Sequence, residues 1–440
     1  MKKNVFLGLL VILLAFCLTV VGCDNGSTNN QGNNTTPTHT HEWGEWIVTK
    51  EPTLSEEGVE TRTCRADSSH TETRIIPKIF SSVNSLIAYL SAQPDNDTNT
   101  PYTVFINIDD LTGFNVAIRN SGKYINLNLS GSTFTSIEFN SFFNNDFLIR
   151  VTLPNSVNIE HSVFGRSANL LEINVADDHP NNRSINGVLY NKDITRLIVF
   201  PSGVTGTFTV PTTVTSLSGF QATSLSTLNI HENVDTISLQ TLSISTTLTV
   251  INIAPSNPNY TSANGLILNK DGTTLIMAAG GLSTVTIPNG VTTIGRDAFN
   301  SSSLTSINIP NNVTIIEMQA FVGCINLTSI TLPANLTTIG LMAFQSTGLT
   351  SITIPASVNF LHNNAFRSVN NLSSVTFMGT ISAENFAVTT NVSETMANQV
   401  FPGDLRDKFY EIDPINGTPG TYTTTRNAGD FITAVWTKVN

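Results

Sequence analysis

Four consecutive segments in the C-terminal half share one pattern of apolar and polar positions. They are LSTVTIPNGVTTIGRDAFNSSS from Leu282, LTSINIPNNVTIIEMQAFVGCIN from Leu304, LTSITLPANLTTIGLMAFQSTG from Leu327 and LTSITIPASVNFLHNNAFRSVNN from Leu349. A weaker fifth segment begins at Leu372, and the starting leucines lie 22, 23, 22 and 23 residues apart. A repeat of this length is typical of a solenoid, in which each segment forms one turn.

The order of residues within one segment predicts how a turn folds. The stretch L-x-x-I-x-I alternates apolar and polar positions, which predicts a short strand that ends at the proline. The following V-x-x-I supplies a second apolar contact, and A-F directs a phenylalanine ring inward from a short turn or helix. One turn alone leaves these side chains exposed, so we expect the turns to stack Leu on Leu, Ile on Ile and Phe on Phe.

Less regular units extend the array towards the N-terminus, with starts at Leu148 and Leu225. Two longer units share an insertion that begins Asn-Gly: NGVLYNKD from Asn186 and NGLILNKD from Asn264. Asn-Gly followed by a strand-like run predicts a hairpin, so we expect hairpins on the rim near residues 177–203 and 255–280. We predict about eleven stacked turns between residues 125 and 390.

Three further segments are expected around the array. Residues 41–78 contain WGEW, TRTC and ETR runs that predict a small three-stranded antiparallel module. Residues 79–124 are expected to cap the first turn with a short helix near Ser85–Leu90 and a strand near Val104–Leu111. Residues 391–440 are expected to cap the last turn with Phe431 and Trp436, since an uncovered end would leave an open strand edge.

The N-terminus has the features of an export signal. Residues 1–22 hold two lysines followed by an apolar run and end in a small Gly22, which is the arrangement of a signal peptide. The sequence Val20-Val21-Gly22-Cys23 resembles the bacterial lipobox, and this resemblance implies a mature protein lipidated at Cys23. An ordinary secreted protein and an uncleaved membrane helix are the alternatives. Residues 23–40 contain no residues able to build a core and are expected to be a disordered tether.

Composition and charge narrow the classes of partner. The 440 residues include 40% hydrophobic and only 12% charged residues, with a net charge of −11. Removal of the signal peptide with Lys2 and Lys3 lowers this charge to −13. A chain without a basic run is a poor ligand for nucleic acid. We therefore expect contact with the membrane only through the lipid anchor. The anchor at Cys23 by itself leaves inner and outer membrane open, and we expect the outer membrane or cell surface.

No pattern in the sequence predicts an active site or a cofactor. The chain lacks HExxH, GxSxG, P-loop and dinucleotide-binding motifs, and Asp177-Asp178-His179 is expected to be a solvated loop. His39, His41, Cys64 and His70 offer zinc-ligand atoms, but Asp67 stands where a second cysteine would complete a CxxC pair. We therefore predict no enzyme activity, no metal site and no cofactor. Cys324 takes the repeat position of Ser302, Thr347 and Val369, so it is expected to be a small buried packing residue.

The motif L-x-x-[IV]-x-[IVL]-P-x-x-[VL]-x-x-I-x-x-x-A-F resembles the BspA-like, treponemal-type leucine-rich repeat family, and the NGVLYNKD insert fits the same family. The resemblance covers about residues 120–440. It implies a β-rich solenoid: a curved leucine-rich repeat array with a parallel β-sheet on one face and short turns or helices on the other, preceded by the small antiparallel module. It also implies a cell-surface protein that binds host matrix or plasma proteins, or other bacteria.

Strand alternation predicts which side chains face outward on the repeat strands. These are small polar residues in two rows: Thr284, Thr286, Ser306, Asn308, Ser329, Thr331, Ser351, Thr353, Ser374 and Thr376. We call this set the hydroxyl face and take it as the candidate ligand surface for an extended protein. It could equally be a solvated surface of strand-forming residues. A surface-coat protein without a specific ligand, and a glycan-binding protein, are the alternative functions.

Overall fold

The structure is a computed structural model that describes residues 40–138, 141–159, 163–220, 223–237, 245–386, 400–424 and 434–439. The chain forms two compact units, of which the first contains residues 57–76 and the chain up to Glu51. The expected signal peptide, most of the tether with Cys23, and Phe431 lie outside the described residues.

The first unit is the expected three-stranded antiparallel module. Its strands are β1 (Ile47–Lys50), β2 (Gly58–Thr63) and β3 (Thr71–Ile76), paired in the order β1-β2-β3. The Arg62 guanidinium lies 5.0 Å from the ring centre of Trp43 and 4.7 Å from that of Trp46, and Arg74 lies 4.5 Å from the Trp46 ring. Cation–π contacts between strands therefore take the place of a deep apolar core.

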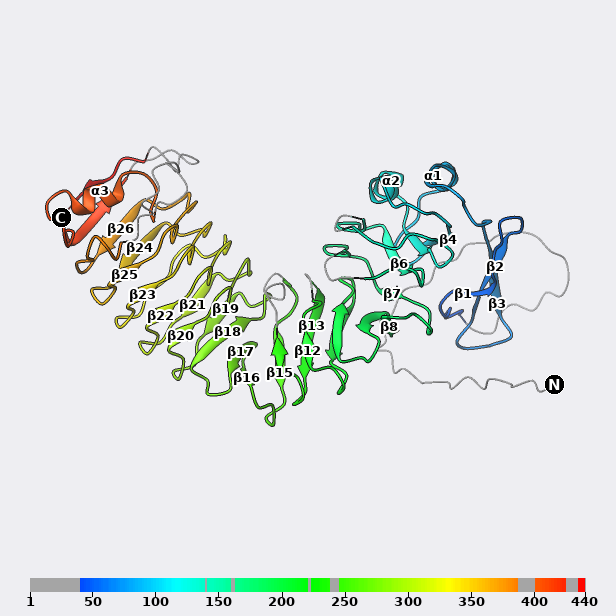
Figure 1. The fold of residues 1–440 in the computed structure, drawn as a ribbon, viewed down its shortest axis with the longest axis horizontal. Coiled ribbons are helices and arrows are strands. Elements are labelled where there is room, and N and C mark those ends of the chain that lie inside the picture. The colour runs from blue at the N-terminus through cyan, green and yellow to red at the C-terminus, as the bar shows by residue number, and fades with distance from the viewer. Residues whose placement is uncertain are drawn as a thin grey trace. The chain divides into compact units, whose positions relative to one another are not determined.

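The second unit begins with two helices and a four-stranded parallel sheet, all near one end of its ribbon (Figure 1). The elements are α1 (Val83–Ser91), β4 (Tyr102–Phe105), α2 (Phe114–Ser121), β5 (Ile125–Asn128), β6 (Leu148–Thr152) and β7 (Glu172–Asn174). Helix α1 agrees with the helix expected at Ser85–Leu90. The expected strand Val104–Leu111 is shorter, because Asp110 Oδ1 accepts the Thr112 N–H at 3.0 Å in a turn that leads into α2.

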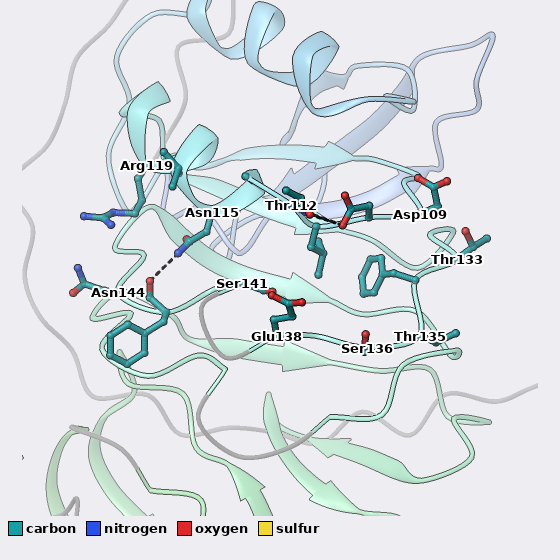
Figure 2. Close-up of a pocket in the computed structure, with 16 residues that line it drawn as sticks. Asp109, Thr112, Asn115, Arg119, Thr133, Thr135, Ser136, Glu138, Ser141 and Asn144 are labelled. Carbon is teal, nitrogen blue, oxygen red and sulfur yellow. Dashed lines mark hydrogen bonds between the residues drawn. The ribbon is translucent and has the colours of Figure 1, made fainter.

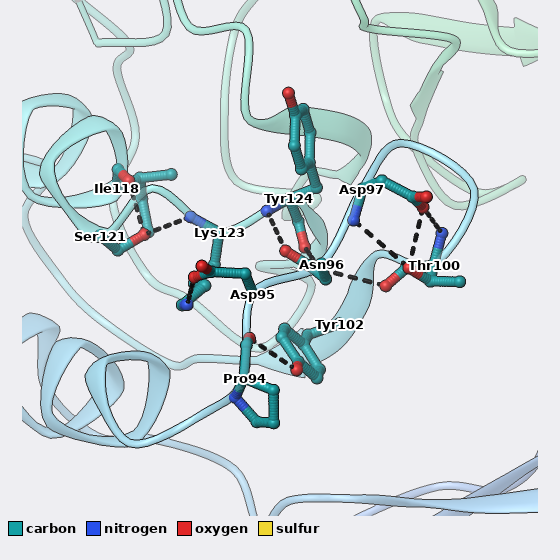
Figure 3. Close-up of polar contacts among 10 residues, drawn as sticks. All are labelled: Pro94, Asp95, Asn96, Asp97, Thr100, Tyr102, Ile118, Ser121, Lys123 and Tyr124. Atoms are coloured by element: carbon teal, nitrogen blue, oxygen red, sulfur yellow. Dashed lines mark hydrogen bonds and ion pairs between the residues drawn. The ribbon is translucent and has the colours of Figure 1, made fainter.

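Strand β4 belongs to the stack rather than lying across its end. It pairs in parallel with β5, which pairs with β6, which pairs with β7. Figure 3 shows the polar contacts that hold the connection before β4: the Asn96 side chain donates to the Tyr124 carbonyl at 2.8 Å and accepts from its N–H at 3.0 Å. The buried Lys123 pairs with Asp95. The ladder of parallel strands thus begins ahead of residue 125.

The middle of the second unit contains both expected hairpins. Its strands are β8 (Asn182–Ile185), β9 (Val188–Asn191), β10 (Arg196–Val199), β11 (Thr205–Thr209), β12 (Ser216–Leu217), β13 (Ser224–Ile230), β14 (Thr236–Ile237), β15 (Val250–Ile253), β16 (Tyr260–Ala263), β17 (Leu266–Asn269) and β18 (Thr274–Ala278). Asn186 and Gly187 at the β8–β9 turn have φ of 49° and 75°, and Asn264 and Gly265 at the β16–β17 turn have 51° and 78°. Positive φ at both central residues is the turn that Asn-Gly favours, because it matches strand twist.

The regular repeats form the remaining turns, which lie side by side in Figure 1. Their strands are β19 (Thr284–Thr286), β20 (Thr293–Ile294), β21 (Ser306–Asn308), β22 (Ile315–Ile316), β23 (Thr338–Ile339), β24 (Ser351–Ile354), β25 (Phe360–Leu361) and β26 (Ser374–Phe377). The V-x-x-I segments, expected to supply only an apolar contact, form a second parallel ladder β20-β22-β23-β25, which continues from β18 of the second insert. The array is a β-solenoid of about 12 turns, close to the predicted eleven.

The core confirms the expected stacking of like on like. Phe299, Phe321, Phe344 and Phe366 stack with neighbouring ring centres 5.0, 5.1 and 5.1 Å apart and rings within 9° of parallel. Phe401 continues this ladder at 4.6 Å from Phe366. Offset-stacked aromatic rings at such distances contribute beyond their burial. One apolar ladder therefore links four regular turns to the C-terminal segment.

The C-terminal segment ends the parallel ladder by reversing strand direction. It contains α3 (Leu405–Tyr410), β27 (Gly420–Thr423) and β28 (Thr437–Lys438), and β27 pairs antiparallel with both β26 and β28. Trp436 is buried, and its indole N–H donates to the Pro402 carbonyl at 2.8 Å. The structure thus agrees with the expectation that Trp436 helps to cover the last turn.

Candidate functional site

The hydroxyl face lies on the segments that begin each regular turn, and these are strands in every turn except that of Ser329–Thr331. Its members in the first four turns are exposed: Thr284, Thr286, Ser306, Asn308, Ser329, Thr331, Ser351 and Thr353. The residues between them point inward, as Val285 and Ile352 do, because alternate side chains of a strand face opposite sides. The register places Thr284 beside Ser306 and Thr286 beside Asn308. Neighbouring turns therefore bring these side chains into adjoining positions.

A hollow of about 300 Å³ opens in the middle of the hydroxyl face. Five of the predicted residues line it, together with Asn311: Thr284, Thr286, Ser306, Asn308 and Thr331. Its lining contains no charged side chain, and its apolar part comes from residues that include Ile307 and Leu332. Such a surface offers hydrogen-bond donors and acceptors at short range and no charged group for an ion pair.

The strand ladder is interrupted beside this hollow. Strand β21 pairs with β19, and β24 pairs with β26, while Ser329–Thr331 belong to no strand of the described chain. The second ladder continues through the same turns, from β22 to β23. The interruption is thus confined to the hydroxyl face, where the main-chain groups of Ser329–Thr331 take part in no strand pairing.

The last two predicted positions are placed differently. Ser374 and Thr376 are half-buried, because β27 pairs with β26 across their strand. The Thr376 hydroxyl lies 3.0 Å from the hydroxyl of Thr421. The C-terminal cap therefore occupies the end of the row, and the open surface ends with Ser351 and Thr353.

A second hollow, about 690 Å³, lies over the first turns and was not predicted (Figure 2). Its lining includes the carboxylates of Asp109, Asp110 and Glu138, the Arg119 guanidinium and the exposed Val116. The Asn115 amide donates to the Phe143 carbonyl at 2.9 Å and holds α2 against the following turn. The residues are dispersed over four segments of the sequence, so no local motif could have revealed this hollow.

Cys324, Cys64 and His41 are packed against neighbouring side chains or main-chain groups. Cys324 is fully buried and its thiol donates to the Phe299 carbonyl at 3.0 Å, and burial raises the pKa of this thiol to about 11. This agrees with its expected packing role. In the first unit, the His41 ring stacks on Trp43 at 4.8 Å and Cys64 is buried. The described residues contain no group of three or more His, Cys, Asp or Glu able to hold a metal ion.

The Asp177-Asp178-His179 cluster agrees only in part with the expected solvated loop. Asp177 and Asp178 are exposed, as expected. His179 is instead fully buried, and both of its ring nitrogens contact main-chain groups.

Among the described residues, no helix has the length and apolar character to cross a membrane.

Comparison with known proteins bears on the repeats. The chain matches the family described as BspA type leucine rich repeat region in six copies, over residues 98–195, 199–266 and 277–398. Curated proteins gave no match.

Solved structures gave weaker likenesses. A leucine-rich repeat protein from Eubacterium ventriosum is 22% identical with a TM-score of 0.43, over 62% of this chain and 72% of that one. The pneumococcal vaccine antigen PcpA is 16% identical with a TM-score of 0.35, over 67% and 73%. A leucine rich cell surface protein from Faecalibacterium prausnitzii is 18% identical with a TM-score of 0.35, over 62% and 72%. The repeat match alone spans more than half of the sequence, and on that ground this chain belongs to the BspA type leucine-rich repeat family.

Proposed function

We propose that this protein is a lipid-anchored adhesin of the bacterial surface, whose repeat array binds host matrix or plasma proteins, or proteins of other cells. Membership of a leucine-rich repeat family supports a protein-interaction role. The observation that carries the proposal further is the hydroxyl face, where eight small polar side chains are exposed around an uncharged hollow.

The chemistry of this face suits weak, repeated contacts. Its residues can both donate and accept hydrogen bonds but include no aromatic or arginine side chain, the types that dominate tight interfaces. Many copies anchored on one cell would compensate by avidity, since linked binding events raise the effective concentration. This is the arrangement expected of a surface adhesin.

Lysine substitutions on the hydroxyl face are expected to weaken binding. In soluble protein lacking residues 1–23, Thr331→Lys and Thr353→Lys each place a long charged side chain at an exposed position. We expect the Kd for immobilised fibronectin, fibrinogen or laminin to rise about tenfold or more, since desolvating an unpaired charge costs at least 1–2 kcal/mol. Surface plasmon resonance measures the change.

Asn359→Lys is the matched control, because Asn359 is also exposed but stands before β25 in the second ladder. It adds the same charge and is expected to leave the Kd unchanged. If unmodified protein binds none of the three probes, the matrix-adhesin proposal fails. Binding to a glycan panel instead would favour the glycan-binding alternative.

The anchor is tested separately in the full-length chain. We expect Cys23→Ser to abolish labelling of the protein by radioactive palmitate in growing cells, because the acyl chains attach through the Cys23 sulfur and provide the membrane affinity. Cys17→Ser, within the same apolar run, is the control and should keep the label. Equal labelling of the two variants would contradict lipidation at Cys23.

A further inference from the structure

His179 fastens an insert of the array to the turn before it. It lies between β7 and β8 with none of its surface exposed. Its Nε2 donates to the Val157 carbonyl at 3.1 Å, while Nδ1 accepts the Asn181 and Asn182 N–H groups at 3.3 and 3.1 Å. Because Nδ1 faces two donors, the ring must be neutral with its proton on Nε2.

The second insert makes the same contacts with an amide. Asn257 stands at the equivalent position between β15 and β16 and is also fully buried. Its Nδ2 donates to the Val234 carbonyl at 2.9 Å, and its Oδ1 accepts the Asn259 and Tyr260 N–H groups, each at 2.9 Å. In both inserts, the side chain therefore donates to the carbonyl of a valine in the preceding turn and accepts two main-chain N–H groups of its own insert.

In each insert, a lysine side chain donates to two main-chain carbonyls at equivalent positions. The Lys192 ammonium donates to the carbonyls of Asp177 and His179 at 3.0 and 2.7 Å. The Lys270 ammonium donates to the carbonyls of Pro255 and Asn257 at 2.9 and 2.6 Å. The two inserts thus share the same set of contacts to main-chain groups. Only the first is held by a titratable side chain, His179, whereas Asn257 carries no titratable group.

We propose that His179 is an acid-sensitive clasp: at neutral pH it fastens residues 177–182 to the turn at Val157, and its protonation releases this segment. An imidazolium carries a proton on each nitrogen, so protonated Nδ1 would face the Asn181 and Asn182 donors and both bonds would be lost. If the protonated ring stayed in place, Nε2 could keep its bond to the Val157 carbonyl. The second proton, on Nδ1, would then be buried without an acceptor, which is unfavourable.

The charges around the clasp act in opposite directions. Burial is the main cause that lowers the pKa of His179 below its usual value of 6.5. The hydrogen bond to the Val157 carbonyl opposes this shift, while the Lys192 ammonium adds to it. The Asp178 carboxylate, held by the Asn155 amide at 2.8 Å, raises the pKa. Asp177 is the other acidic group of this loop, and the described part of the preceding turn contributes only uncharged groups at Asn155–Val157.

The sign of the pH effect follows from this balance. A histidine whose folded pKa lies below its unfolded value is neutral in the closed clasp, so the opened state binds more protons. The closed clasp is therefore stable above pH 6.5 and weakens as the pH falls below that value. The opening equilibrium rises about tenfold per pH unit until His179 titrates in the closed state.

Amide hydrogen exchange of the full soluble chain tests the clasp. Between pH 7.5 and pH 5, we expect the protection factors of the Asn181 and Asn182 amides to be constant above pH 6.5 and to fall below it, with a slope of at most about tenfold per unit. The Asn259 and Tyr260 amides of the second insert are the internal control. They are measured in a His231→Asn background, because the Asn257 amide also donates to the carbonyl of this second histidine at 3.1 Å. They should keep constant protection factors, because Asn257 does not titrate.

Two exchanged variants separate the clasp from general acid sensitivity. His179→Asn copies a side chain that the second insert already accommodates, so it is expected to fold and to remove the pH dependence at residues 181 and 182. Asn257→His is expected to create that dependence at residues 259 and 260. Parallel loss of protection in both inserts of the His231→Asn chain, or persistent pH dependence at residues 181 and 182 in His179→Asn, would overturn the proposal.

Discussion

Phe344→Ala is expected to lower the free energy of unfolding by about 3–5 kcal/mol, the usual cost of removing a buried aromatic side chain. Phe344 is fully buried and stacks between Phe321 and Phe366, with both ring-centre distances 5.1 Å. Its loss leaves a cavity in the middle of the ladder, because the backbone of each turn is hydrogen-bonded to the turns on both sides and cannot close around it. Guanidinium denaturation followed by circular dichroism measures the change.

Phe360→Ala is the control for that experiment. Phe360 lies in β25, is only half-buried and contacts the His362 ring edge to face at 4.9 Å outside the phenylalanine ladder. We expect Phe360→Ala to lower the free energy of unfolding by less than half as much as Phe344→Ala, because a half-buried ring removes less apolar surface from water. An equal cost for the two variants would show that stacking within the ladder adds nothing to stability.

Trp436→Ala is expected to expose the end of the array and to destabilise it by about 3–5 kcal/mol. The indole is 1% exposed, its Nε1 donates to the Pro402 carbonyl, and the Trp436 N–H donates to Asp404 Oδ1 at 2.7 Å. Its removal uncovers the last turn and weakens the support of β28 beside β27. An exposed strand edge recruits other chains, so we also expect concentration-dependent association. Thermal melting and light scattering measure both effects.

Trp436→Phe separates packing from hydrogen bonding at this position. It keeps an aromatic ring but removes the donor to Pro402, so we expect a loss of about 1–3 kcal/mol from the unpaired buried carbonyl and no association. Association by Trp436→Phe as strong as that by Trp436→Ala would contradict the role of the indole as a cover for the terminal turn.

The repeat pattern was sufficient to predict most of the fold. The recurrence of Leu, Ile and Phe at 22 and 23 residues could be satisfied only by stacking, and the rings from Phe299 to Phe366 do stack. Asn186-Gly187 and Asn264-Gly265 predicted two hairpins because few other dipeptides adopt positive φ at both positions so readily. Strand alternation also predicted correctly that Thr331 and Thr353 are exposed.

Other features depend on contacts between residues distant in the sequence. The V-x-x-I segments form strands of two residues, too short to be seen as strands before the neighbouring turns supply their partners. The hollow lined by Asp109 and Glu138, and the burial of His179 under Val157, likewise arise only when separate turns meet. Ser374 and Thr376 fit the outward pattern but lie beneath the pairing of β26 with β27.

The turn before each stacked phenylalanine shows where local chemistry ends and tertiary packing begins. Asp297, Gln319, Met342 and Asn364 all adopt a left-handed backbone, with φ between 56° and 59°. Asp and Asn tolerate this conformation, but Gln and Met have no such preference. Periodic apolar residues determine that a solenoid forms, because burial is shared by every turn. The backbone path within each turn is instead imposed by its neighbours, whose hydrogen bonds and stacked rings together outweigh the local strain.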